Sequence, residues 1–77
     1  MSADKMFKEL GYKLEKKYSN GINYIGEDED VIAFIKGYQY DNDKVVKIEK
    51  FYDYITIPEL QAINQKCKEL GWIQEEN

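Results

Sequence analysis

The thiol of Cys67 is the side chain best suited to nucleophilic catalysis, and it is the chain's only cysteine. A cysteine nucleophile needs a neighbouring base to form the thiolate, yet the 77 residues include no histidine. Cys67 also falls on the apolar side of an expected helix, where a thiol is buried and unreactive. We therefore expect no catalytic residue, no intramolecular disulfide and no multi-cysteine zinc site, and we do not expect an enzyme.

Two acidic segments contain residue types that bind metals or transfer protons. Residues 27–30 are four consecutive carboxylates, but neighbours along a strand or turn point in different directions and stay ionised in water. Residues 41–43 begin like a calcium loop, which needs a further oxygen ligand and a glycine where this chain has Val45 and Val46. We therefore expect two solvated turns, with no metal and no cofactor. The alternative for residues 27–30 is an acidic surface that docks on a basic protein.

Tyrosine is the remaining residue type that could form a functional site. The chain has seven tyrosines: Tyr12, Tyr18, Tyr24, Tyr38, Tyr40, Tyr52 and Tyr54. Their rings provide broad, rigid contact area with a polar tip, which is typical of binding surfaces. The last four are expected to lie in pairs on two adjacent strands, and we predict that the pairs converge into one interaction surface. The alternative is that they cover a sheet face, half-buried, as packing.

Charge argues against nucleic acid as the main partner. The formal net charge is −4, and all eleven basic residues are lysine, with no arginine. Arginine is the residue that most often reads a guanine edge, and affinity for phosphates depends on positive charge. Tyrosines beside Lys36, Lys44, Lys47 and Lys50 would nevertheless suit the stacking of unpaired bases. Single-stranded nucleic-acid binding by a tyrosine and lysine sheet face is therefore the alternative function.

The pattern of apolar and polar residues predicts an antiparallel meander. The expected strands cover residues 12–18, 22–26, 31–40 and 45–50. Ser19-Asn20-Gly21 suits a tight hairpin turn, and the apolar run 31–35 indicates a central strand. Alternation breaks near Lys50, so we expect a bulge or the end of the strand there.

Helix signals lie on both sides of these strands. Residues 3–10 can form a short helix that ends at Gly11. Thr56 and Glu59 match a capping box, Pro58 suits the first turn, and Gly71 ends a long helix. Its apolar stripe, expected to face the core, consists of Ile57, Leu60, Ile63, Cys67 and Leu70.

Together these elements predict an α+β domain of two layers. It has a short N-terminal helix, an antiparallel meander of three to four strands, and a C-terminal helix packed on one sheet face. One domain is expected to span residues 1–77, with 1–5 and 74–77 frayed. The alternative is a coiled three-stranded barrel in which residues 50–55 form an irregular linker.

Two segments resemble a known group of proteins. Residues 55–72 (ITIPELQAINQKCKELGW) and 6–12 (MFKELGY) resemble the two ends of short proteins encoded by phages and prophages of low-GC Gram-positive bacteria. This group has no assigned activity, so the resemblance implies context only: a small accessory protein made in a bacterial cytoplasm.

The sequence therefore favours a non-enzymatic interaction module. Its expected partner is a host or phage protein, with a homodimer as another form of association. The chain has no apolar run long enough for a membrane span or a leader, so we expect a cytoplasmic protein that does not bind membranes.

Overall fold

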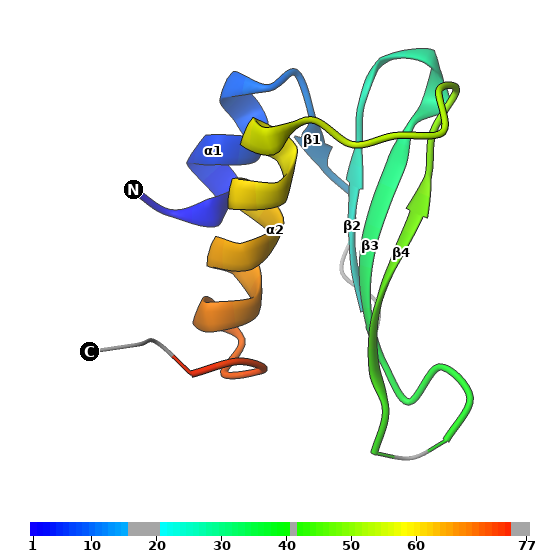
Figure 1. Cartoon of the computed structure of the whole chain (residues 1–77), viewed down its shortest axis with the longest axis vertical. Coiled ribbons are helices and arrows are strands. Elements are labelled where there is room, and N and C mark those ends of the chain that lie inside the picture. The colour runs from blue at the N-terminus through cyan, green and yellow to red at the C-terminus, as the bar shows by residue number, and fades with distance from the viewer. Residues whose placement is uncertain (16–20, 41, 75–77) are drawn as a thin grey trace.

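The computed structural model describes residues 1–15, 21–40 and 42–74. Its elements are α1 (Ala3–Glu9), β1 (Lys13–Leu14), β2 (Gly21–Ile25), the 3₁₀ turn η1 (Glu27–Glu29), β3 (Val31–Lys36), β4 (Lys44–Glu49) and α2 (Ile57–Glu69). The two helices form one layer and the sheet forms the other (Figure 1). The predicted α+β class is confirmed.

The sheet is an antiparallel meander in the order β1-β2-β3-β4. Strand β3 lies between β2 and β4, as its apolar run predicts, and its middle residues Ile32, Ala33 and Phe34 are buried. The acidic residues 27–30 form the turn between β2 and β3. The three-stranded barrel alternative is wrong, although residues 50–55 are irregular as that alternative proposed.

The ends of the strands differ in part from the prediction. Strand β4 ends at Glu49, as expected, but β3 ends at Lys36 instead of continuing to Tyr40. Gly37 has a φ of 74°, a left-handed conformation that turns the chain out of the sheet, and its N–H donates to the Asp43 carbonyl at 2.8 Å. Part of the predicted first strand and of its turn, residues 16–20, lies outside the described residues.

Both helices end with the same local structure. Each closes with leucine, a glycine at positive φ, and an aromatic residue: Gly11 precedes Tyr12, and Gly71 precedes Trp72. The N–H of each aromatic residue donates to a carbonyl five residues back, at 2.9 and 2.8 Å, which is the Schellman cap. Helix α1 begins at Ala3, with Ser2 as its N-cap. Residues 3–5 are therefore helical, and the expectation that they fray is corrected.

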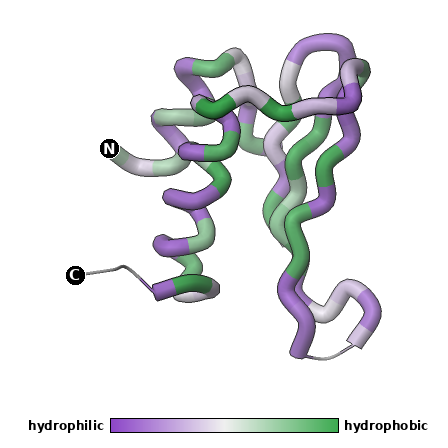
Figure 2. The backbone as a smooth tube through the Cα atoms, viewed as in Figure 1, coloured by the Kyte–Doolittle hydropathy of each residue, from purple (hydrophilic) through white to green (hydrophobic). Residues whose placement is uncertain are grey.

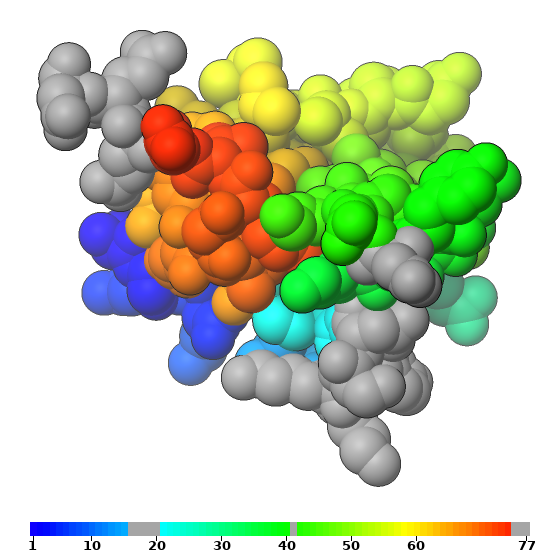
Figure 3. Space-filling model, turned by 90° about the horizontal axis from the view of Figure 1, so that it is seen from below, coloured from blue at the N-terminus to red at the C-terminus, as the bar shows by residue number. Residues whose placement is uncertain are grey.

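Aromatic rings join the two layers. Phe7 of α1 stacks on Tyr24 of β2 at 4.1 Å between ring centroids, and both contact Phe34 of β3 edge-on. Trp72, which follows α2, packs against Phe34 at 6.2 Å between ring centroids. Seen from below, the end of α2 and the residues that follow it lie directly against the sheet (Figure 3). Burial of each large ring contributes about 1.5–3 kcal/mol, so these contacts fix the helices on the sheet.

Helix α2 is rotated relative to the prediction. Its buried residues are Glu59, Ala62, Ile63 and Lys66, whereas Ile57 is 66% exposed and Leu60 is 47% exposed. The predicted core stripe is thus wrong at its first two positions. Two charged side chains take the core-facing positions because other parts of the chain supply partners for them, as described next.

Candidate interaction surface

Two of the tyrosines belong to the core. Tyr12 and Tyr24 are almost fully buried, and each hydroxyl donates a short hydrogen bond to a carboxylate, that of Glu59 and of Asp4 respectively. Each of these carboxylates also meets a lysine from a different part of the chain. The structure therefore holds two tyrosine, carboxylate and lysine clusters between its layers.

The first cluster centres on Glu59. Its carboxylate accepts from the Lys50 Nζ at 2.6 and 2.7 Å and from the Thr56 N–H of the capping box at 2.8 Å. Burial by itself would raise the pKa of Glu59, but the hydrogen bonds from Lys50, Tyr12 and Thr56 lower that pKa to about 2. Burial, followed by the bond to Glu59, raises the pKa of Tyr12. This cluster ties α2 to the end of β4.

The second cluster centres on Asp4. The Lys66 Nζ lies 3.4 Å from the Asp4 Oδ1 and 5.8 Å from the centre of the Tyr24 ring. Burial, followed by the hydrogen bond to Asp4, raises the pKa of Tyr24. Lys66 is buried while its partner Asp4 is exposed. This cluster ties α2 to α1.

The four candidate tyrosines are exposed, but they do not converge. Tyr38, Tyr40, Tyr52 and Tyr54 are between 55% and 72% exposed. The first pair follows β3 and the second pair follows β4, so they lie at opposite ends of the β3 and β4 hairpin (Figure 1). Five residue steps of the ladder separate these ends, or about 17 Å. The predicted single surface is therefore two surfaces, and neither pair lies on a strand.

The second pair belongs to a segment that we name the aromatic loop, residues 51–54. Its three rings contact one another: Phe51 meets Tyr52 edge-on at 5.0 Å, and Tyr52 stacks on Tyr54 at 5.7 Å. The loop is held where it begins, because the Phe51 N–H donates to the Asp30 carboxylate at 2.8 Å. Lys50, just before it, is held by Glu59. An exposed aromatic group is thus fixed in place by hydrogen bonds to two other elements.

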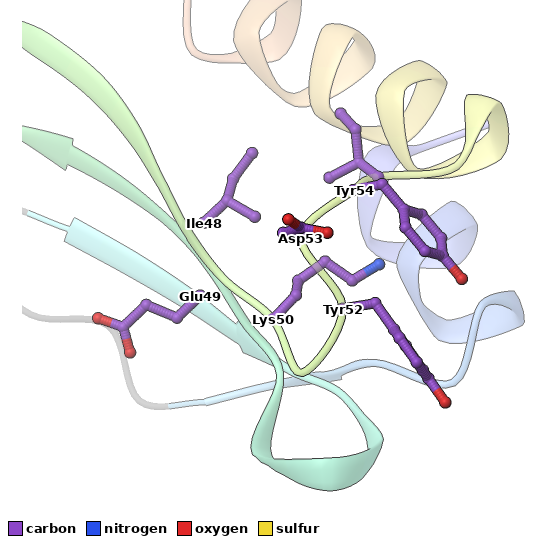
Figure 4. A pocket seen from close by; sticks show the side chains of 7 residues that line it. Ile48, Glu49, Lys50, Tyr52, Asp53 and Tyr54 are labelled. Carbon is purple, nitrogen blue, oxygen red and sulfur yellow. The ribbon is translucent and has the colours of Figure 1, made fainter.

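An open hollow of about 540 Å³ lies beside this loop. Its lining residues are Ile48, Glu49, Lys50, Tyr52, Asp53, Tyr54 and Ile55. Ile48 is 41% exposed and supplies apolar surface on the strand side. In Figure 4, Tyr52 and Tyr54 extend side by side away from the loop, and the amino group of Lys50 lies near the Tyr54 ring, at 5.7 Å from its centre. The hollow therefore combines apolar, aromatic and carboxylate groups.

The first tyrosine pair has different surroundings. The Lys47 Nζ lies 5.9 Å from the centre of the Tyr38 ring and also pairs with Glu49 at 3.0 Å, and Glu49 raises the pKa of Lys47. The Asp43 carboxylate accepts from the N–H groups of Gln39 and Tyr40, at 3.0 and 3.2 Å, and so shapes the turn. We name this turn, residues 37–43, the hairpin tip; Asp41 within it lies outside the described residues.

Sequence reasoning missed part of the exposed apolar surface. Phe51 was not among the predicted surface residues, and Ile57 and Leu60 were assigned to the core, yet all three are exposed. They follow or precede Tyr52 and Tyr54 closely along the chain. The break in alternation near Lys50 was the only signal that this segment leaves the sheet.

Cys67, the residue considered for nucleophilic catalysis, lies on α2. Cys67 is half-buried among core side chains, and burial raises the pKa of its thiol. Within residues 1–15, 21–40 and 42–74, no three histidine, cysteine, aspartate or glutamate side chains gather as a metal site requires. In the same part of the chain, neither helix is long and apolar enough to span a bilayer.

Comparisons of the chain with protein-family models, with curated protein sequences and with solved structures each found no match.

Proposed function

We propose that this chain is a non-enzymatic protein-interaction module that binds its partner through the aromatic loop. In keeping with the resemblance noted above, we propose that it is a phage or prophage accessory protein that acts in the bacterial cytoplasm. The observation that supports the proposal is the group of three exposed, mutually packed rings of Phe51, Tyr52 and Tyr54.

The loop has the properties of a binding surface. The hydration of exposed aromatic side chains is unfavourable. A small monomeric protein therefore rarely has several of them in one exposed patch unless the patch binds a partner. The anchoring bonds of Phe51 to Asp30 and of Lys50 to Glu59 limit its freedom. A fixed loop loses less conformational entropy on binding, which favours affinity. Ile57 and Leu60, in the first turn of α2, are also exposed.

The test is partner capture with matched variants. The tagged chain is incubated with lysate of a Gram-positive host, with and without nuclease, and retained proteins are identified by mass spectrometry. The double variant Tyr52→Ala/Tyr54→Ala should lose a nuclease-resistant partner, whereas Tyr38→Ala/Tyr40→Ala should retain it. Both should fold, because all four rings are exposed. Equal capture by the two double variants would contradict the proposal.

A second candidate function is single-stranded nucleic-acid binding at the hairpin tip. One observation favours it: the Lys47 amino group lies against the Tyr38 ring, and Lys36 pairs with Lys44 in the register just before the tip. Stacking on tyrosine beside lysine is the usual arrangement for unpaired bases. This candidate predicts the reverse result, namely nuclease-sensitive capture that Tyr38→Ala/Tyr40→Ala removes and that falls steeply with salt.

A further inference from the structure

We infer that the partner of the aromatic loop is a protein segment that carries lysine or arginine side chains among apolar ones. This inference rests on the proposed function and specifies the chemistry of the partner. It combines three features of the same end of the molecule: its charge, the hollow, and the exposed rings.

Negative charge is concentrated around the loop. Residues 27–30 and 47–54 contain six carboxylates and two lysines, and the bond from Phe51 to Asp30 brings the two segments together. Their net charge of −4 equals that of the whole chain. The turn 27–30 is hydrophilic along its length (Figure 2). Lys50 is buried and paired with Glu59, and Lys47 pairs with Glu49, so neither lysine is paired with Asp53 or with the turn 27–30.

The hollow has groups that can contact both the apolar and the cationic side chains of such a segment. The exposed surface of Ile48 and the rings of Tyr52 and Tyr54 provide contact area for an apolar side chain. Asp53 lines the same hollow and can accept hydrogen bonds from an ammonium or guanidinium group. The side chain of Glu49 extends away from the hollow (Figure 4) and pairs with Lys47. The ring of Tyr54 already has one cation near it, that of Lys50 at 5.7 Å. A cationic side chain of a partner can use the exposed aromatic surface in the same way.

Charge also disfavours the other occupants. A second copy of the chain docked symmetrically here would bring together two surfaces of charge −4, and like charges placed opposite each other oppose association. The phosphates of a nucleic acid would meet the same repulsion. A cationic and apolar protein segment is the occupant that the charge and the apolar surface favour together.

The test uses peptides of known composition and the full chain labelled with ¹⁵N. The probe is an acetylated, amidated octapeptide of alternating lysine and leucine, and its twins have glutamine or glutamate in place of lysine. We expect the lysine peptide to shift the amides of residues 50–55 and 27–30 and to bind about tenfold or more tightly than either twin, less so at high salt. Equal binding of the glutamine twin, or shifts spread evenly over all acidic residues, would overturn the inference.

Variants separate this inference from the proposed function. Asp28→Asn/Asp53→Asn removes one exposed carboxylate from the acidic turn and one from the hollow, and Glu9→Gln/Glu15→Gln removes the same charge from exposed positions elsewhere. The first pair of substitutions should weaken the binding of both the lysine peptide and the captured partner several-fold. The second pair should leave both affinities unchanged. If capture depends on Tyr52 and Tyr54 but both charge variants behave alike, the interaction module stands and the cationic partner is wrong. If capture does not depend on the two tyrosines, the proposed function fails.

Discussion

The buried carboxylate of Glu59 offers a quantitative test of the fold. Glu59→Gln keeps the size of the side chain but leaves the buried Lys50 amino group without its counter-charge. The folded pKa of about 2, against about 4.3 in an unfolded chain, corresponds to about 3 kcal/mol of stability. Loss of one partner of a buried ion pair typically costs about 3–5 kcal/mol. We therefore expect Glu59→Gln to lower the free energy of unfolding at neutral pH by about 3 kcal/mol.

The pH dependence gives the sign of the effect. The pKa of Glu59 is lowered by folding, so its contribution is fully present above the unfolded pKa and is lost as the pH falls toward the folded value of about 2. The difference between wild type and Glu59→Gln should therefore be largest at neutral pH and shrink between about pH 5 and pH 2. The contributions of all other carboxylates are the same in the two proteins, so they cancel when the free energies of unfolding are subtracted.

The assay is urea unfolding followed by the fluorescence of Trp72, the only tryptophan, which packs on Phe34. With a slope of about 1 kcal/mol per M urea, the midpoint should move by about 3 M. The free energy of unfolding of a domain of this size is about 4–12 kcal/mol, so the variant should still fold and its unfolding should be measurable at low temperature. Glu9→Gln, at an exposed position of α1, is the control and should change stability by less than about 0.5 kcal/mol. A loss below about 1 kcal/mol, or a difference that does not shrink in acid, would refute the role assigned to Glu59.

Three further predictions follow from local geometry. Gly26→Ala should cost about 1–3 kcal/mol in urea unfolding, because a Cβ there would lie 2.8 Å from the Tyr12 ring; an unchanged midpoint would mean that the ring moves freely. Gly71→Ala should cost only about 1 kcal/mol, from strain at its φ of 74°, since nothing lies within 4 Å of the added atom; a larger loss would indicate an unseen contact. The Cys67 thiol should react with a disulfide reagent more slowly in the folded chain than in urea, because burial raises its pKa. Equal rates in the folded and unfolded chain would contradict that burial.

Much of the fold can be predicted from the sequence because the interactions that define it join residues close together in the chain. The capping box of Thr56 and Glu59 joins residues three positions apart, and the Schellman caps at Gly11 and Gly71 span one helical turn. The apolar run 31–35 is typical of a central strand, and β3 pairs with a neighbour along each of its edges. Helix ends, the order of elements and the α+β class follow from interactions of this range.

The orientation of α2 depends on partners far away in the sequence. Periodicity places Ile57 and Leu60 toward a core and Glu59 and Lys66 toward water. The structure reverses this because Tyr12 and Lys50 reach Glu59, and Asp4 reaches Lys66. No pattern within the helix records these contacts, because they come from residues up to 62 positions away.

The candidate interaction surface likewise depends partly on local sequence and partly on contacts between distant residues. The sequence by itself determined that the chain has many tyrosines, few groups suited to catalysis and a strongly acidic turn, since these are properties of composition. Only the tertiary structure decided that Tyr12 and Tyr24 are buried and that the two exposed pairs lie apart. The physical reason is the hairpin: antiparallel strands place the residue that leaves one strand and the residue that leaves the next at opposite ends of the ladder.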